Sequence, residues 1–130
     1  MKALNPKTIA PPFAAYSHGA EIPAGYRMVR TSGQLGISSD GSVPIDTFAQ
    51  AIICFENIDA ILTEAEMNKS DIFHLTAYVT DRNHMQDYMR ARDAYLENVE
   101  KLPASTLLIV SGFTREEFKV EVEASAACPQ

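Results

Sequence analysis

Two glutamates near the C-terminus have the spacing that places side chains on one face of a strand. Glu121 and Glu123 alternate with apolar residues in the segment FKVEVEASA. Residues two apart in a strand point to the same face, about 7 Å from each other. Paired carboxylates can divide the acid and base steps of a hydrolysis between them. A polar strand face without chemistry is the alternative, and the sequence alone leaves both open.

Two further segments place small polar groups beside apolar runs. Ser105 and Thr106 follow Pro103 and precede LLIV, so they mark either the mouth of a small-molecule site or only the start of a strand. The segment TSGQLG (31–36) lacks both the GxGxxG spacing and the lysine of a phosphate-binding loop. The N–H of Gly33 is unshielded by a side chain and could bind a ligand oxygen. A strand ending in a tight turn is the simpler interpretation.

Composition argues against several classes of partner. His18, His74 and His84 lie far apart without metal-ligand spacing, so we expect no metal. The net charge is −6 and the 11 lysines and arginines are scattered, so no nucleic-acid partner is expected. The chain has two cysteines, Cys54 and Cys128, and they do not form the pattern of a disulfide framework, which favours a reducing compartment. No signal peptide and no run of about 20 apolar residues is present. We therefore expect a cytoplasmic protein.

Hydrophobic periodicity predicts seven elements. Strands are expected at 13–22, 26–34, 71–80, 106–112 and 118–126, with the first two forming a hairpin, and helices at 46–67 and 83–99. Asp46 is the expected N-cap of the first helix, and Asn83 with Gln86 fits a capping box for the second. The inward stripe of the second helix is apolar apart from Arg92.

These elements predict a single α+β domain over residues 1–130. Two amphipathic helices can cover only one face of such a sheet. The segment 106–112 is nevertheless apolar on both sides, which is typical of a strand buried on both faces. Another subunit is the simplest cover for the second face, so we expect an oligomer.

Six segments, in this order along the chain, resemble the Rid family (RidA/YjgF), whose members are also labelled L-PSP endoribonuclease or translation inhibitor. They are AYSHGAEI (15–22), TSGQLG (31–36), AIICFENIDAILTEA (51–65), LTAYVTDRNHMQDYMRARDAYL (75–96), LPAST (102–106) and FKVEVEASA (118–126). Each is weak alone, and their order and spacing carry the resemblance.

The resemblance implies a chorismate-mutase-like α+β fold, with a mixed sheet and two helices on one face. It also implies a homotrimer with a central β-barrel and with ligand clefts between subunits. The activity implied is hydrolysis of reactive enamines and imines, such as 2-aminoacrylate, to keto acids and ammonia. No cofactor is implied.

The family's site positions carry over to four residues of this chain. Tyr16 matches the cleft tyrosine, and Ser32 and Gly33 match the small residues of the cleft floor. Glu121 matches the acid that positions the attacking water, a role that suits a carboxylate because it can orient the water and accept its proton. Thr106 follows at the strand mouth and completes the expected binding residues there.

Two positions depart from the family pattern. Ser105 stands where deaminating members carry an arginine that grips the substrate carboxylate with a two-pronged contact. Arg27 and Arg30, on the strand leading to TSGQ, are the nearest replacements along the sequence. His18 stands where many members have glutamine; its imidazole titrates near neutral pH and could bind substrate or transfer a proton, or be a surface residue.

Three functions follow from these residues. The first is a hydrolase or deaminase acting on an imine, enamine or related amine metabolite, other than a typical 2-aminoacrylate deaminase; aminomuconate-type deamination falls in this class. The second is a non-enzymatic trimer that binds a small metabolite and regulates or protects another protein. A ribonuclease or translation inhibitor is the weakest alternative, because the chain is acidic and has no basic stripe.

Overall fold

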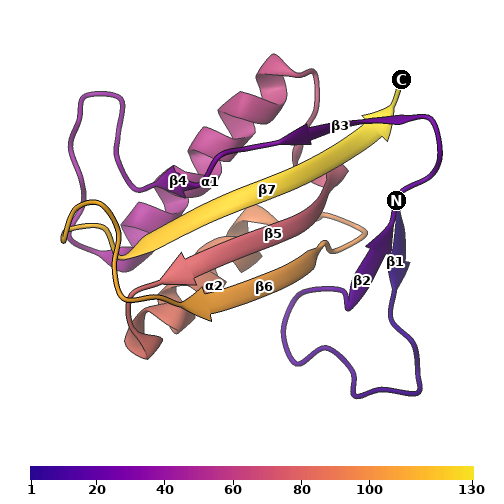
Figure 1. Cartoon of the computed structure of the whole chain (residues 1–130), viewed down its shortest axis with the longest axis horizontal. Coiled ribbons are helices and arrows are strands. Elements are labelled where there is room, and N and C mark those ends of the chain that lie inside the picture. The colour runs from indigo at the N-terminus through magenta and orange to yellow at the C-terminus, as the bar shows by residue number, and fades with distance from the viewer.

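The computed structural model describes residues 1–130, and a five-stranded sheet with two helices on one face dominates it (Figure 1). The strands are β3 (Tyr26–Arg30), β4 (Gln34–Leu35), β5 (Ile72–Val79), β6 (Ala104–Ile109) and β7 (Val120–Pro129). Their order is β3-β7-β5-β6, with β4 also pairing with β7. Only β5 and β6 are parallel to each other. Helices α1 (Thr47–Glu64) and α2 (Met85–Tyr95) lie behind the sheet. The predicted α+β fold with a mixed sheet is confirmed.

Alternation along the strands decides which side chains face the helices. Leu75, Ala77 and Val79 of β5 are fully buried, as are Val120 and Val122 of β7. The core also includes Ala51, Cys54, Phe55, Ile58 and Leu62 of α1 and Tyr88 and Ala91 of α2. Full burial of each large apolar side chain stabilises the fold by about 1.5–3 kcal/mol. The intervening residues of both strands therefore point to the open face, away from the helices.

An irregularity in β5 corrects one predicted orientation. The β5–β7 register shifts between Ile72 and His74. Ile72 is consequently fully buried, while Phe73 lines a pocket on the open face instead of the core. The simple alternation of 71–80 would place Phe73 on the same face as Leu75, and the local bulge moves it to the open face.

Of the two predicted helix N-caps, only the one at Asp46 is present in the structure. The side chain of Asp46 accepts a hydrogen bond from the Ala49 N–H at 3.0 Å, as expected of an N-cap. The capping box at Asn83 is wrong: Asp81 instead caps a 3₁₀ turn, η2 (Arg82–His84), and α2 begins after it. A second such turn, η1 (Lys69–Asp71), leads into β5. No helix has both the length and the apolar content needed to cross a membrane.

The N-terminal segment differs most from expectation. Only β2 (Gly19–Glu21) forms within 13–22, and it pairs with β1 (Lys2–Leu4) in a separate small sheet. The predicted hairpin of 13–22 with 26–34 is wrong, because β3 pairs along β7. The loop between β1 and β2 extends beyond the sheet (Figure 1). Ser17 fixes it to the chain before β6, donating its N–H to Pro103 O (2.9 Å) and its hydroxyl to Leu102 O (2.7 Å).

Strand β6 lies at an edge of the sheet and is not covered on both faces within one chain. Leu108 and Ile109 are 48% and 46% exposed, and Met28 on the opposite edge strand is 63% exposed. The expected burial of 106–112 on both faces is therefore not met by the chain itself. Leu108 and Met28 thus leave exposed apolar surface on the open face, of the kind that a second subunit would cover.

Candidate functional site

Glu121 and Gly33 meet on the open face, where β4 joins β7. Leu35 pairs with Glu121 in the β4–β7 ladder, which brings the preceding turn against the carboxylate. A side chain on Gly33 would overlap the Glu121 carboxyl group, so the carboxyl group can occupy this position only beside a glycine. The N–H groups of Ser32 and Gly33 donate no hydrogen bond within the chain, and the exposed Ser32 hydroxyl makes none. The carboxyl group thus lies against Gly33, and the N–H groups of Gly33 and of its neighbour Ser32 are both unused.

The Glu121 carboxyl group has no polar partner within the chain. It is half-buried, accepts no hydrogen bond and forms no ion pair. Partial burial, followed by the nearby charge of Glu123, raises the pKa of Glu121 above its ordinary value. A general base works best when its pKa lies closer to the operating pH. The shift therefore makes Glu121 a better acceptor of a water proton than an ordinary surface glutamate.

Glu123, by contrast, is held by a network on the open face. The Tyr78 hydroxyl donates to its Oε1 at 2.7 Å, and Arg30 Nη2 lies 3.4 Å from its Oε2. Arg30 Nη1 also donates to Ser125 Oγ at 3.4 Å. The hydrogen bond from the Tyr78 hydroxyl to Glu123 is the main cause of the raised pKa of Tyr78. The two glutamates therefore differ: one anchors neighbouring side chains and the other is free to react.

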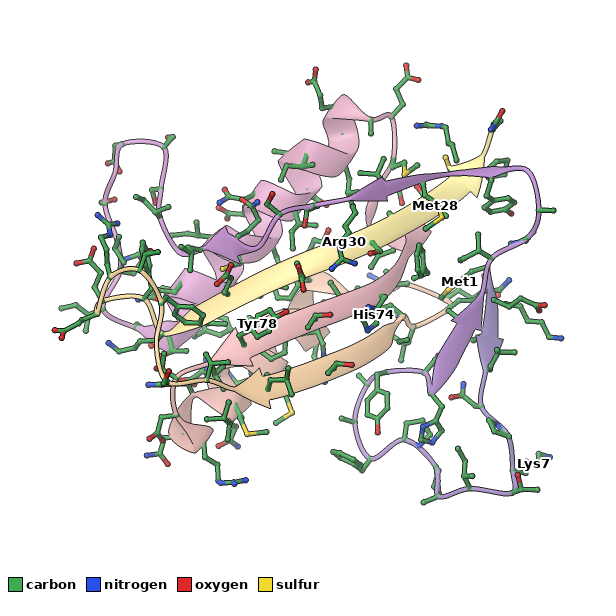
Figure 2. All side chains as sticks on the ribbon, in the orientation of Figure 1. Met1, Lys7, Met28, Arg30, His74 and Tyr78 are labelled. Atoms are coloured by element: carbon green, nitrogen blue, oxygen red, sulfur yellow. The ribbon has the colours of Figure 1, made fainter.

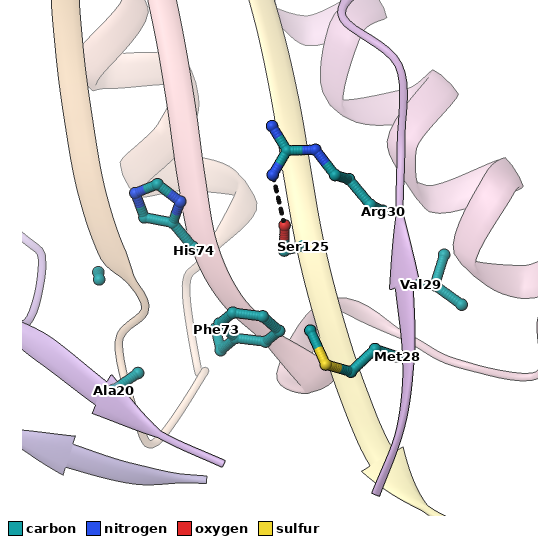
Figure 3. Close-up of a pocket in the computed structure, with 8 residues that line it drawn as sticks. Ala20, Met28, Val29, Arg30, Phe73, His74 and Ser125 are labelled. Atoms are coloured by element: carbon teal, nitrogen blue, oxygen red, sulfur yellow. Dashed lines mark hydrogen bonds between the residues drawn. The ribbon is translucent and has the colours of Figure 1, made fainter.

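The side chains of Arg30, His74 and Ser125 line a pocket of about 480 Å³ on the same face, together with Ala20, Met28 and Phe73 (Figure 3). Figure 2 shows Met28, Arg30, His74 and Tyr78 projecting from the side of the sheet opposite the helices. Arg27 alternates with them and belongs to the other face. Of the two arginines proposed as replacements along the sequence, only Arg30 reaches the open face, where Glu123 already pairs with it.

A second cluster lies at the β6 edge, against α2. Ser105 pairs with Leu75, so its side chain shares the helix side of the sheet. There Tyr16, Arg92 and Ser105 line a cavity of about 200 Å³ whose remaining walls are mainly apolar, including Met85, Met89 and Leu107. Neither the Tyr16 nor the Ser105 hydroxyl makes a hydrogen bond within the chain. Tyr16, Ser105 and Arg92 therefore line one cavity.

One chain therefore holds two separate clusters of candidate site residues. Glu121 pairs with Tyr78 on the open face, while Ser105 faces the helices on a strand beyond β5. Thr106 is exposed on the open face of β6 and lies outside the cavity. His18 is also outside it, with its N–H bonded to Asn5 Oδ1 and its Nε2 2.6 Å from Ala10 O, so it fixes the N-terminal loop.

The groups that could do metal or thiol chemistry are not arranged for it. Nowhere do three His, Cys, Asp or Glu side chains gather in a way that could hold a metal ion. The Cys54 thiol, on α1 beneath β4, donates to Gln34 O at 3.1 Å. Burial, with the Glu121 charge nearby, raises the pKa of Cys54 to about 12. The thiol therefore stays protonated near neutral pH and is a poor nucleophile.

Comparison with known proteins assigns this arrangement to a family. The family model described as Endoribonuclease L-PSP matches residues 7–128. The chain belongs to this family, the Rid (YjgF) family. The 2-iminobutanoate/2-iminopropanoate deaminase of Escherichia coli is a relative 32% identical over 101 residues, which are 76% of this chain and 78% of that protein. The resemblance found in the six sequence segments is confirmed.

Solved structures of Rid proteins share the whole fold. The Rid protein YyfB of Yersinia pestis matches with a TM-score of 0.87 at 25% identity, over 98% of both chains. The structure of TdcF of Escherichia coli with bound serine matches with a TM-score of 0.73 at 25% identity, over 98% of this chain and 99% of that one. The Rid fold thus accounts for nearly every residue of this chain.

Arg92 is the residue of this cavity that sequence reasoning did not place in a site. Its signal was present, because it is the one charged side chain in the otherwise apolar stripe of α2. A charge is rarely buried without a partner or a function. What the sequence did not show is that α2 faces the start of β6 at this point, so that Arg92 and Ser105 line the same cavity.

Proposed function

We propose that this chain is a hydrolase that converts the imine, or the imine tautomer of an enamine, of a small amine metabolite to a carbonyl compound and ammonia. The observation that carries the proposal is the free Glu121 carboxyl group, with its raised pKa, beside the unused N–H groups of Ser32 and Gly33. The names of the relatives support it, since one is a deaminase of 2-imino acids and another was solved with bound serine.

The reaction needs a base that later returns its proton. Glu121 accepts a proton from water as the water oxygen attacks the imine carbon, the C=N π electrons pass to nitrogen, and Glu121 returns this proton to the nitrogen. The resulting carbinolamine then gives its hydroxyl proton to Glu121. Glu121 passes this second proton to the nitrogen as the C–N bond breaks, so ammonia leaves, a carbonyl compound remains and Glu121 is again a carboxylate. The N–H groups of Ser32 and Gly33 stabilise negative charge on the attacking oxygen.

The site is completed by a second copy of the chain. The Glu121 half-site lies beside β4 and the Tyr16–Ser105–Arg92 half-site lies at the β6 edge, on opposite faces. A small ligand cannot contact both within one chain. Head-to-tail association of copies brings different surfaces together and closes into a ring. A homotrimer in the cytoplasm, with Glu121 of one copy facing the cavity of the next, satisfies this geometry and covers the apolar open face.

The substrate of this hydrolase differs from 2-aminoacrylate. Ser105 offers a neutral hydroxyl where deaminating relatives hold a carboxylate by a guanidinium fork, and such charge-assisted contacts are worth about 1.5–3 kcal/mol. Either another residue of the site supplies the positive charge that binds a carboxylate, or the ligand carries no carboxylate at this position. Either case shifts the preferred substrate away from the shortest 2-imino acids.

A metabolite-binding protein without catalysis is the second candidate. The separation of the two half-sites within one chain favours it, because the cavity with Tyr16 and Ser105 can hold a ligand without Glu121. The two candidates differ in one measurable property, which is turnover.

The test is the decay of imines in the presence of purified protein. A panel of 2-imino acids is generated in situ by an amino-acid oxidase, and each remaining imine is trapped with semicarbazide. We expect acceleration for some members of the panel and its loss in Glu121→Gln. The matched control is Glu116→Gln, an exposed glutamate in the loop before β7, which should retain full activity. Turnover unchanged in Glu121→Gln would remove the proposed base, and no turnover for any imine would favour the binding protein.

A further inference from the structure

Arg92 is a buried cation with donors that the chain does not use. Its side chain is only 4% exposed, and a guanidinium keeps its charge at all accessible pH values. Nε and Nη2 both donate to a single oxygen, Asp93 Oδ1, at 3.2 and 3.1 Å. Nη1 donates no hydrogen bond within the chain. A guanidinium has five N–H donors, so most of its capacity remains open.

The unused nitrogen is not fully buried, and the side chain that carries it lines the cavity. Tyr88 Oη is the one fully buried side-chain nitrogen or oxygen atom that lacks a hydrogen-bond partner. Because Arg92 Nη1 also lacks a partner, it must retain some accessible surface, and Arg92 lines the cavity that Tyr16 and Ser105 also line. A buried charge is costly unless it is paired and hydrogen-bonded. Arg92 is therefore arranged to receive an acceptor from inside the cavity.

The rest of the cavity defines what that acceptor belongs to. Two free hydroxyls, of Tyr16 and Ser105, add neutral donors, while Met85, Met89 and Leu107 provide apolar walls. The volume of about 200 Å³ is below that of pockets for drug-sized ligands. Asp93, with a side chain 53% exposed, already neutralises part of the guanidinium charge. A single negative charge on a short apolar body fits this balance better than a dianion such as phosphate.

From this geometry we infer that Arg92 is the anion-binding residue of the cavity and that its ligand is a small monocarboxylate, the substrate of the proposed hydrolase. The inference depends on the proposed function for the reaction but not for the binding. Arg92 belongs to α2 and Ser105 to β6, and both line the cavity. A carboxylate bound at Arg92 is therefore held from a different element than the one that carries the arginine of deaminating relatives.

The experiment measures binding of butanoate to the full-length protein by calorimetry, with butanamide as the uncharged analogue and inorganic phosphate as the dianion. We expect saturable binding of butanoate and little of the other two. Arg92→Met removes the charge but keeps an unbranched apolar stem, and should weaken butanoate binding about ten- to a hundredfold. Arg90→Met is the matched control on the same helix, since Arg90 is 60% exposed; it should bind as the wild type does.

Two further variants keep the test decisive if Arg92→Met fails to fold. Arg92→Lys retains the charge but not the planar fork, and should bind butanoate more weakly than the wild type. Asp93→Asn removes the competing carboxylate and should bind butanoate more tightly, an effect that a purely structural role for Arg92 does not produce. Equal affinity in wild type and Asp93→Asn, or equal affinity for butanoate and butanamide, would overturn the inference.

Binding and turnover separate this inference from the proposed function. Arg92-dependent butanoate binding without imine hydrolysis would leave the anion site standing and reject the hydrolase. Hydrolysis that depends on Glu121, together with butanoate binding that Arg92→Met does not weaken, would support the hydrolase and reject the anion site.

Discussion

Replacing Gly33 by alanine tests whether the position of the Glu121 carboxylate matters. A Cβ on Gly33 would lie 2.7 Å from Glu121 Cδ, whereas ordinary van der Waals contact begins at 3.4 Å. The carboxyl group must therefore retreat by the difference, at least about 0.7 Å. A displacement near 1 Å of a reacting group can cost about a hundredfold in rate. We expect Gly33→Ala to lose between ten- and a hundredfold of imine hydrolysis, by this relation.

The fold should survive this change, because Glu121 is a flexible side chain at the surface of the sheet and can rotate away. We expect the free energy of unfolding to fall by about 1 kcal/mol or less, at the cost of an off-rotamer glutamate. The control is Gly19→Ala, where the nearest side-chain atom to a new Cβ lies at 3.4 Å, so both rate and stability should be retained. Full activity in a well-folded Gly33→Ala would refute the assigned position of the base.

Three further outcomes are expected. The rate of imine hydrolysis should fall as pH drops through the raised pKa of Glu121, because the carboxylate form of Glu121 is the base. Glu123→Gln removes the adjacent negative charge and should move this loss of rate to lower pH. The same pH profile in wild type and Glu123→Gln would contradict this effect of Glu123. With 2-aminoacrylate generated by a dehydratase, pyruvate formation should be accelerated far less than by an arginine-bearing Rid protein; comparable rates would contradict the role of Ser105. Gln50→Leu removes three buried hydrogen bonds to Pro44 O, Glu117 O and the Lys119 N–H and should cost about 2–4 kcal/mol in denaturant unfolding; a loss below 1 kcal/mol would show that these bonds contribute little.

The sequence predicted those elements whose patterns depend on local periodicity. Alternation in 118–126 placed Glu121 and Glu123 on the outward face correctly, and helical spacing found α1 with its Asp46 cap. It failed where partners distant in sequence decide the outcome. Residues 13–18 have strand-like composition, but Ser17 forms only an isolated bridge to Ala104, the first residue of β6, and hydrogen bonds to the carbonyls just before it. Likewise, the bulge at Ile72 is invisible in the alternation of β5.

The sequence names candidate site residues but not how they are grouped. Tyr16, Ser105, Gly33 and Glu121 are each expected in a site from the sequence, yet nothing in their spacing shows that the sheet separates Gly33 and Glu121 from Tyr16 and Ser105. Arg92 was visible as a charge in an apolar stripe, and its significance appeared only when α2 was found against β6. Side chains brought together by tertiary packing leave no periodic signal in the chain.

Complementation between two inactive variants tests most directly whether the site is shared between copies. Glu121→Gln lacks the base, while Ser105→Phe fills the cavity with an aromatic ring, so each alone should be inactive. Mixed in equal amounts, unfolded together and refolded, the two should regain roughly a quarter of wild-type imine hydrolysis, because in a closed ring one interface in four then joins an intact base to an open cavity. A mixture no more active than the separate variants would contradict a catalytic site built from two chains.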